Sequence, residues 1–441
     1  MVMNYVRQAL RADRLWAVVA TLVAASVILA SCGTSSPTTG AASSAATGAT
    51  AGPAAAATTA PAPAATTAPA AVAPTTSPAA SLAKTPIKIG VAVGLTGYMS
   101  DNDTHYSEGA QLAAKVLNAQ GGVDGHEIQL SVVDMQSNAA MDVTVANQLL
   151  NQKGIDVLLH GSVSAGTAAI APIVSNKEVP MIAASVLPSD PTWTFSVLQP
   201  VSSTNAIALD FLSKVLHAKK VAVLYSQTPY GQQAAAALGK QAEALGISVP
   251  WSQGAATDAT DLTPIVQQIQ AANVDAVIDT LTGPNHIVFA KDATSSGLKI
   301  PVIMGTDART TFKQATDANP NSYWTGIAAQ VYPNNADSAV NTADAALVQA
   351  YTQAYGNADR PGLGNAGRGW DSIQMLNIAV HNSGAVTGKA LLSALENVAY
   401  AGSESEYKYT PRDHTGQVDV PNPLSIAQYQ GSTLKVVYPT K

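Results

Sequence analysis

IDVLL at residues 155–159 and VDAVI at residues 274–278 are two aliphatic stretches that each carry an aspartate at the second position. Each is followed along the chain by an aliphatic stretch with a proline at its second position, VPMI at 179–182 and IPVI at 300–303. The shared order, residue types and spacing predict two lobes built on one plan. An alternative stays open, because any two α/β units contain aliphatic strands of this kind.

The surrounding sequence alternates strand-like and helix-like patterns. The stretch 87–93 alternates and then runs apolar, as a buried strand does. A helical stripe follows and ends at Gly121-Gly122; its members are Ala110, Ala113, Ala114 and Leu117. Further strands are predicted at 128–133, 155–159, 221–225 and 247–250. Strands that alternate with helices of this length predict an α/β fold whose parallel sheets are covered on both faces.

Cys32 is the only cysteine in the 441 residues, and it directly follows Leu29-Ala30-Ser31. An aliphatic residue, two small residues and a cysteine match the bacterial lipobox. The uncharged stretch 17–30 that precedes it has about 14 residues, fewer than the ~20 of a spanning helix. A basic region stands before that stretch, with Arg7, Arg11 and Arg14. Residues 1–31 are therefore predicted to be a lipoprotein signal peptide, and Cys32 to be lipidated. The alternative is a buried cysteine on an apolar segment.

A linker is predicted over residues 32–84. From Gly33 to Ala83 the chain contains no charged residue and consists mainly of Ala, Thr, Ser, Pro and Gly. Such a segment cannot bury enough apolar surface to offset its conformational entropy, so we expect it to be disordered. It would hold the folded part away from the membrane, while the lipid on Cys32 anchors the protein at the extracellular face of the bacterial cell.

Composition and motifs exclude several classes of function. The net charge is −6 and no basic cluster is present, so no nucleic-acid partner is expected. The seven histidines are scattered, so neither a metal nor a cofactor is expected. Gly90, Gly94 and Gly97 have the spacing G-x-x-x-G-x-x-G, which is not a dinucleotide fingerprint. No G-x-S-x-G motif surrounds Ser162 or Ser164, and the protein is therefore expected not to be an enzyme.

A series of short motifs in order resembles one known family, the extracellular solute-binding proteins of ABC transporters of the leucine/isoleucine/valine-binding type. The motifs include LTG at 95–97, NAQGGV at 118–123, GHEI at 125–128 and DHTGQV at 413–418. The similarity covers residues 85 to 437. It implies a type I periplasmic-binding-protein fold, in which two Rossmann-like lobes joined by three crossovers close on a small solute.

The resemblance also implies an organisation and partners. The crossovers are expected near 199–203, 331–333 and 407–410. Lobe 1 is then expected at 85–201 plus 333–407, and lobe 2 at 202–332 plus 408–441. A monomer that delivers its ligand to ABC permease and ATPase subunits is expected. The sequence leaves open a sensor of the same fold that signals to a membrane receptor.

The resemblance and the physics of parallel sheets both place the ligand beyond the carboxyl ends of the strands. In the family, the serine that matches Ser164 binds the ligand carboxylate. The alternative role for Ser164 is that of an ordinary N-cap serine. Ser185 and Leu187 match the segment that completes this half of the site. Leu187 stands where a threonine is common, which removes one hydrogen bond.

From lobe 2, Tyr230 matches an aromatic residue that closes over the ligand, and Asp307 matches the acidic residue that pairs with its ammonium group. The alternatives are a packing tyrosine and an aspartate that caps a helix. Asn102 and Thr282 stand where relatives often have aromatic residues, so a more polar pocket is expected. Serine donors opposite an aspartate predict an amino acid as ligand, with an amide or small carboxylic acid as the alternative.

Overall fold

A computed structural model describes the chain at residue 82 and over residues 84–332, 338–356, 362–416 and 424–439. The predicted signal peptide, the predicted lipidation site Cys32 and the linker as far as residue 81 lie outside these ranges. No helix within them is both long and apolar enough to cross a membrane.

The first sheet contains five strands, all parallel, in the spatial order β2-β1-β3-β4-β5. The bounds are β1 Lys84–Val93, β2 His126–Asp134, β3 Val157–His160, β4 Met181–Ala183 and β5 Thr194–Ser196. Ile89 of β1 pairs with Val157 of β3 at the centre of the sheet. Every residue of β3 and β4 is buried, which explains why these strands read as unbroken apolar runs.

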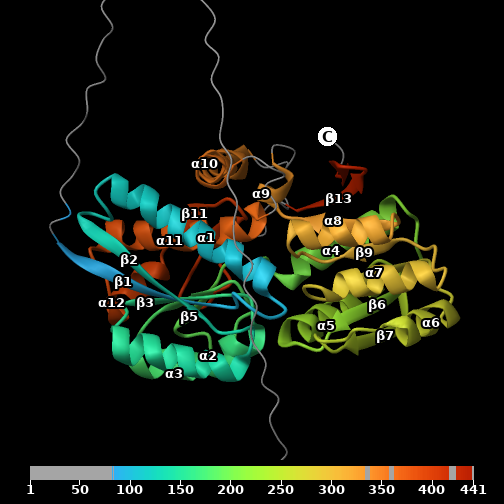
Figure 1. Cartoon of the computed structure of the whole chain (residues 1–441), viewed down its shortest axis with the longest axis horizontal. Coiled ribbons are helices and arrows are strands. Elements are labelled where there is room, and N and C mark those ends of the chain that lie inside the picture. The colour runs from blue at the N-terminus through green and yellow to red at the C-terminus, as the bar shows by residue number, and fades with distance from the viewer. Residues whose placement is uncertain (1–81, 83, 333–337, 357–361, 417–423, 440–441) are drawn as a thin grey trace, which may run out of the picture. The chain divides into compact units, whose positions relative to one another are not determined.

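Helices cover both faces of the first sheet (Figure 1). One face packs against α1 Ser100–Ala119, α10 Ser338–Tyr355, α11 Leu363–Ser383 and α12 Gly388–Leu395. The other face packs against α2 Ala139–Gln148, its π-helical continuation Leu149–Lys153, and α3 Ser164–Lys177. Helices α1 and α11 cross closely, because a Cβ atom added at Gly109 would lie 1.8 Å from the carbonyl oxygen of Ala366. This contact fixes the start of α11 beside the middle of α1.

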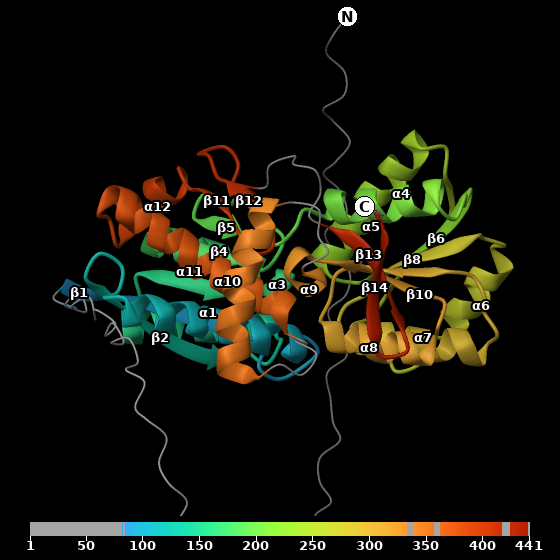
Figure 2. The same ribbon diagram turned by 90° about the horizontal axis from the view of Figure 1, so that it is seen from above.

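The second sheet contains seven strands in the order β14-β13-β10-β9-β8-β6-β7. The bounds are β6 Lys220–Ser226, β7 Ser248–Ala255, β8 Ala276–Thr280, β9 Val302–Met304, β10 Ser322–Gly326, β13 Ser425–Gln430 and β14 Thr433–Tyr438. Strands β6 to β10 are parallel, whereas β13 and β14 extend the sheet in antiparallel fashion beside β10 (Figure 2). The sequence patterns did not predict this antiparallel extension.

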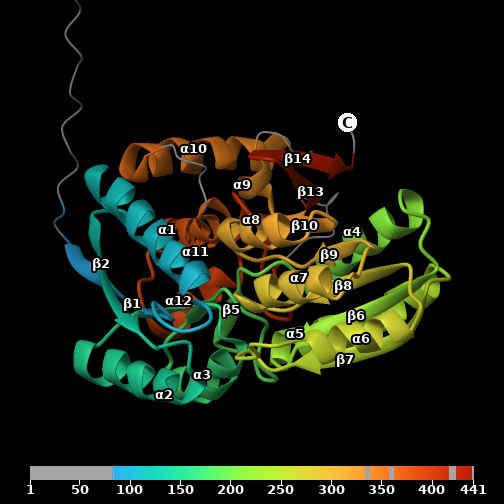
Figure 3. The same cartoon turned by 45° about the vertical axis from the view of Figure 1, so that its right-hand side comes forward.

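The second sheet is likewise covered on both faces (Figure 3). One face packs against α4 Val201–Lys214 and α5 Pro229–Ala244. The other packs against α6 Thr263–Ala271, α7 Asn285–Ser295 and α8 Arg309–Ala318. Each sheet therefore has its own hydrophobic core on each face.

The chain passes between the two sheets three times: after β5, after β10 and the short helix α9 Ala328–Val331, and after the hairpin of β11 Ala399–Ala401 and β12 Glu406–Lys408. The predicted fold class, two α/β lobes with parallel sheets joined by three crossovers, is confirmed. The residue boundaries of the lobes stay a prediction, and part of the second and third passages, at 333–337 and 417–423, lies outside the described ranges.

Candidate functional site

A cavity of about 480 Å³, including its opening to solvent, lies between loops of the two sheets. Its walls are formed by Tyr98, Met99, Asn102, Ser162, Ser164, Ala184, Ser185, Leu198, Thr228, Tyr230, Thr282, Thr306, Asp307 and Arg368. Most of these residues come just after the carboxyl ends of β3, β4, β5, β6, β8 and β9. Parallel sheets bind ligands at this edge, so the cavity is the candidate site.

The start of α3 forms one wall. Ser164 is the first residue of the helix, lines the cavity and is 6% exposed. The alternative role for Ser164, as the N-cap, is wrong, because Val163 occupies that position. Backbone N–H groups of a first helical turn have no partner within the helix. This wall therefore offers N–H donors and a hydroxyl group to an anion.

Asp103 fixes the loop in front of α3. Its carboxylate is fully buried and accepts hydrogen bonds from the backbone N–H groups of Gly94 and Ser162, both at 2.8 Å. Burial raises the pKa of Asp103, although these two hydrogen bonds lower it. A Cβ atom added at Gly161 would lie 2.2 Å from this carboxylate, so only glycine fits there.

The loop after β4 completes this wall. Ser185 is 1% exposed and lines the cavity, and its hydroxyl donates to the carbonyl oxygen of Val186 at 3.2 Å. Leu187, two residues further on, is half-buried and is not among the residues that line the cavity.

Asp307 is the most heavily hydrogen-bonded group on the opposite wall. Its Oδ1 accepts from the Asn102 side-chain amide at 2.9 Å and from the Ala308 N–H at 2.6 Å, and its Oδ2 accepts from the Gly283 N–H at 2.6 Å. Helix α8 begins at Arg309 with Ala308 as its N-cap, so Asp307 is not the cap that the alternative predicted.

A buried histidine stands behind Asp307. His286 is fully buried, with Nδ1 3.0 Å from Asp279 Oδ2 and Nε2 3.5 Å from Asp307 Oδ2. Burial by itself lowers the pKa of His286, but the two carboxylates outweigh it and raise the pKa to about 10. Burial likewise raises the pKa of Asp307, but His286 and the backbone donors outweigh it and the pKa falls below its usual value. The protonated His286 therefore lies between the side chains of two aspartates, Asp279 and Asp307.

Tyr230 and Thr282 line the same side of the cavity. Tyr230 stands in the first turn of α5, whose N-cap Thr228 accepts a hydrogen bond from the Gly231 N–H at 3.1 Å. Burial raises the pKa of Tyr230, so its hydroxyl remains a neutral donor and acceptor. The Thr282 hydroxyl lies 2.9 Å from the Ser226 hydroxyl. Both residues bring a hydroxyl group to the cavity, and the Tyr230 ring also adds aromatic surface. The more polar pocket expected from Asn102 and Thr282 stays a prediction.

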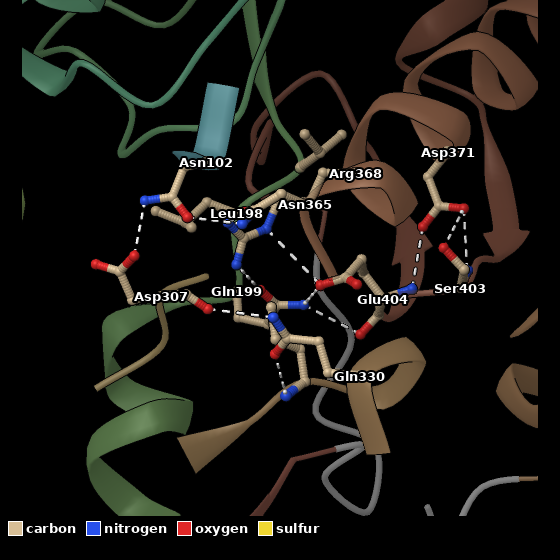
Figure 4. Close-up of polar contacts among 12 residues, drawn as sticks. Asn102, Leu198, Gln199, Asp307, Gln330, Asn365, Arg368, Asp371, Ser403 and Glu404 are labelled. Atoms are coloured by element: carbon tan, nitrogen blue, oxygen red, sulfur yellow. Dashed lines mark hydrogen bonds and ion pairs between the residues drawn. The ribbon is translucent and has the colours of Figure 1, made fainter. Parts of the chain in front are cut away.

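A chain of side-chain amides runs from Asp307 to α11 (Figure 4). Asn102 donates to Asp307, and its Oδ1 accepts from Asn365 Nδ2 at 2.6 Å. Asn365 in turn accepts from Arg368 Nη1 at 2.7 Å. Three consecutive hydrogen bonds thus connect Asp307 of the second lobe to α1 and α11, which both cover the first sheet.

The structure brings together all the predicted site residues except Leu187, and it adds Arg368, which the sequence had not indicated. One signal was present: Arg368 is the only charged residue in the segment Gly362 to Trp370, which otherwise consists mostly of small residues. No group of three or more His, Cys, Asp or Glu side chains suited to a metal ion occurs in the part of the chain that the structure describes.

Comparison with known proteins identifies a family. The family model described as periplasmic binding protein matches residues 86–433. An amino acid binding protein of Pseudomonas aeruginosa is 29% identical over 257 residues, which cover 56% of this chain and 67% of that protein. Leu/Ile/Val-binding protein homolog 7 of Brucella abortus is 25% identical over 303 residues, covering 64% and 74% respectively.

Solved structures share the fold at lower identity. An extracellular ligand-binding receptor from Rhodopseudomonas palustris HaA2 is similar with a TM-score of 0.71 and 21% identity, covering 80% of this chain and 99% of that one. A branched-chain amino acid transporter substrate binding protein from Streptococcus pneumoniae was solved in complex with isoleucine. It is similar with a TM-score of 0.66 and 20% identity, covering 80% of this chain and 99% of that one. These likenesses agree with the two-lobed architecture.

Proposed function

Since the chain belongs to the periplasmic binding protein family, we propose that it captures an amino acid between its two lobes and delivers it to an ABC permease. Family members bind solutes for transport and are not enzymes, and the proposal assigns this chain the same role. The observation that carries the proposal is the cavity, in which hydroxyl groups and a helix start of the first lobe face a carboxylate of the second.

The two walls suit the two charges of an amino acid. Ser164, Ser185 and the N–H groups at the start of α3 would bind the α-carboxylate, because a helix start favours an anion. Asp307 would pair with the ammonium group. His286 is shared between the side chains of Asp279 and Asp307, so it does not serve Asp307 alone and an ammonium group is favoured on this side.

Asn102 shows how closure could be linked to binding. Of the groups that contact the Asp307 carboxylate, Gly283, Ala308 and His286 belong to the second lobe, whereas Asn102 belongs to the first. Opening the lobes would remove only the Asn102 amide and leave one acceptor position free. In the closed form an ammonium group would replace the Asn102 amide with the same kind of donor. The ligand would favour the closed form, and so shift the population towards closure, because only there do its carboxylate and its ammonium group contact both lobes at once.

The remaining parts of the proposal concern location and assembly. Cys32 would carry the lipid that anchors the protein at the extracellular face of the membrane, with the segment up to residue 84 as linker. We propose a monomer whose closed form is recognised by the permease and ATPase subunits. Lobe 1 would comprise 85–201 plus 333–407, and lobe 2 202–332 plus 408–441.

A thermal-shift screen of the full-length chain tests the function. The panel contains amino acids, amides, small carboxylic acids and sugars, and a ligand at 100 times its Kd would stabilise the folded state by about 2.7 kcal/mol. Amino acids are expected to raise the melting temperature. Ser164→Ala should reduce that shift, whereas Ser175→Ala, at the other end of α3, should not. If only uncharged solutes or carboxylic acids without an amino group raise the melting temperature, the amino-acid assignment is wrong.

A further inference from the structure

Arg368 gives the cavity a positive charge that the family resemblance did not assign. The side chain lines the cavity and is 4% exposed. Its hydrogen bonds go to two neutral amide oxygens, Asn365 Oδ1 at 2.7 Å from Nη1 and Gln199 Oε1 at 3.2 Å from Nη2. Its Nε has no hydrogen-bond partner among the residues that the structure describes.

Glu404 is the carboxyl group that the structure pairs with Arg368, and this pair is weak. Its Oε2 lies 3.7 Å from Arg368 Nε, beyond hydrogen-bonding distance, and accepts instead from Gln199 Nε2 at 3.0 Å. Glu404 is fully buried, and this burial raises its pKa to about 8 even though Arg368 lowers it. Neither oxygen of Glu404 accepts a hydrogen bond from the guanidinium among the contacts that the structure describes.

Asp307 does not neutralise Arg368 either. The two charged residues of the cavity wall are joined only through the amides of Asn102 and Asn365, as Figure 4 shows. Asp307 already has His286 as its cation. A buried charge without a hydrogen-bonded anion is costly, and such a charge at the wall of a binding cavity is a candidate for contact with an oppositely charged ligand group.

We propose that Arg368 binds a second carboxylate of the ligand, so that the solute is an acidic amino acid such as glutamate or aspartate. The inference rests on the proposed function of this cleft. Three polar centres of the cavity then meet three charged groups of one solute. The start of α3 with Ser164 holds the α-carboxylate, Asp307 holds the ammonium group, and Arg368 holds the carboxylate of the side chain.

This assignment places each charged group of the ligand beside a protein group of opposite polarity. The side-chain carboxylate meets the Arg368 guanidinium, the ammonium group meets Asp307, and the α-carboxylate meets the start of α3, whose helix dipole carries roughly half a positive charge. A neutral side chain such as that of leucine would instead leave the guanidinium buried without a hydrogen-bonded anion.

The test compares isosteric ligands and matched variants by isothermal titration calorimetry on the full-length chain. Wild-type protein should bind L-glutamate more tightly than L-glutamine, and L-aspartate more tightly than L-asparagine. Arg368→Met removes the charge but keeps most of the apolar stem, and it should weaken L-glutamate binding by about 30-fold or more, because a buried charge pair loses one partner. L-glutamine binding should not fall in this variant. Arg309→Met is the control, since Arg309 bonds to the Tyr429 hydroxyl at 2.7 Å and does not line the cavity.

The outcomes separate this inference from the proposed function. If wild-type protein binds L-glutamine or L-leucine as tightly as L-glutamate, the acidic-ligand assignment is wrong while the amino-acid function stands. Equal losses for L-glutamate and L-glutamine in Arg368→Met would show that Arg368 holds the α-carboxylate or supports the fold, and would also overturn the inference. If no amino acid binds wild-type protein, the proposed function itself fails. Should Arg368→Met not fold, the preference of the wild-type protein decides alone.

Discussion

Replacing Asp307 by alanine should destabilise the ligand-free protein as well as weaken binding. The carboxylate is the acceptor for three donors within 2.9 Å, the Asn102 amide and the N–H groups of Gly283 and Ala308. It is also one of the two anions beside the buried imidazole of His286. Removing it leaves these donors without the acceptor that they have in the fold.

The expected loss in the free energy of unfolding follows from the cost of leaving buried polar groups without hydrogen bonds. Each buried donor without a partner costs about 1–3 kcal/mol. Water entering from the cavity would satisfy some of the three, so a net loss of about 3 kcal/mol is expected from the low end of that range. For a cooperative unit the size of one lobe, this loss corresponds to a fall in melting temperature of roughly 6–12 °C.

Asp317→Ala is the matched control. Asp317 lies in α8, close to Asp307 along the chain, and pairs with Lys313 at 2.6 Å, but 58% of its side chain is exposed. Exposed pairs of this type contribute at most about 1 kcal/mol. Scanning calorimetry and urea unfolding of the ligand-free, full-length chain compare the two variants with wild type. If Asp307→Ala unfolds at the same temperature as Asp317→Ala, the hydrogen bonds that Asp307 accepts do not stabilise the fold.

Three further predictions test other parts of the structure. His286 stays protonated in the fold up to about pH 10 but loses its proton near 6.5 when unfolded. The stability from its pairing with Asp279 and Asp307 is therefore full below pH 6.5 and is lost as the pH rises through about 10. The melting temperature should therefore fall with pH over this window in wild type and fall less in His286→Gln; parallel curves would contradict the ion pair. Gly161→Ala places a Cβ atom against Asp103 and should cost about 1–3 kcal/mol in urea unfolding, and an unchanged midpoint would show that the loop adapts freely. Cys32→Ala should move the protein from the membrane fraction to the soluble fraction of cells, and continued membrane association would exclude the lipid anchor.

Local patterns were sufficient to predict the fold because each buried strand has its own sequence signal. All four residues of β3 are buried, and the apolar run at 155–159 marks that strand directly. The same is true of β8, whose five residues are all buried and whose first three belong to VDAVI. The antiparallel pair β13 and β14 was missed, because only the first three residues of β13 are buried, β14 has no buried residue, and the position of the pair depends on a return of the chain from the other lobe.

The candidate site was predictable where residues directly follow strands. Ser164, Ser185 and Asp307 stand just beyond β3, β4 and β9, so the carboxyl ends of the strands bring them to the cavity. Arg368 was missed because α11 reaches the cavity from elsewhere in the chain. Its approach depends on the close crossing with α1 at Gly109, a contact that no sequence period reveals.

The contacts between the lobes set how much of the closure must come from the ligand. Asn102 donates to Asp307, and Asp101 accepts hydrogen bonds from the hydroxyls of Thr310 and Thr311. Each exchanges with water when the lobes open, so each contributes only about 0.5–1.5 kcal/mol to the closed form. Three such contacts fall below the roughly 5.5 kcal/mol that moves a two-state population from 1:99 to 99:1. Since the ammonium group would replace the Asn102 contact and not add to it, most of the difference must come from ligand contacts that form only when the second lobe closes. Tyr230 and Thr282 line the cavity from the second lobe, so substitutions there are expected to change closure most.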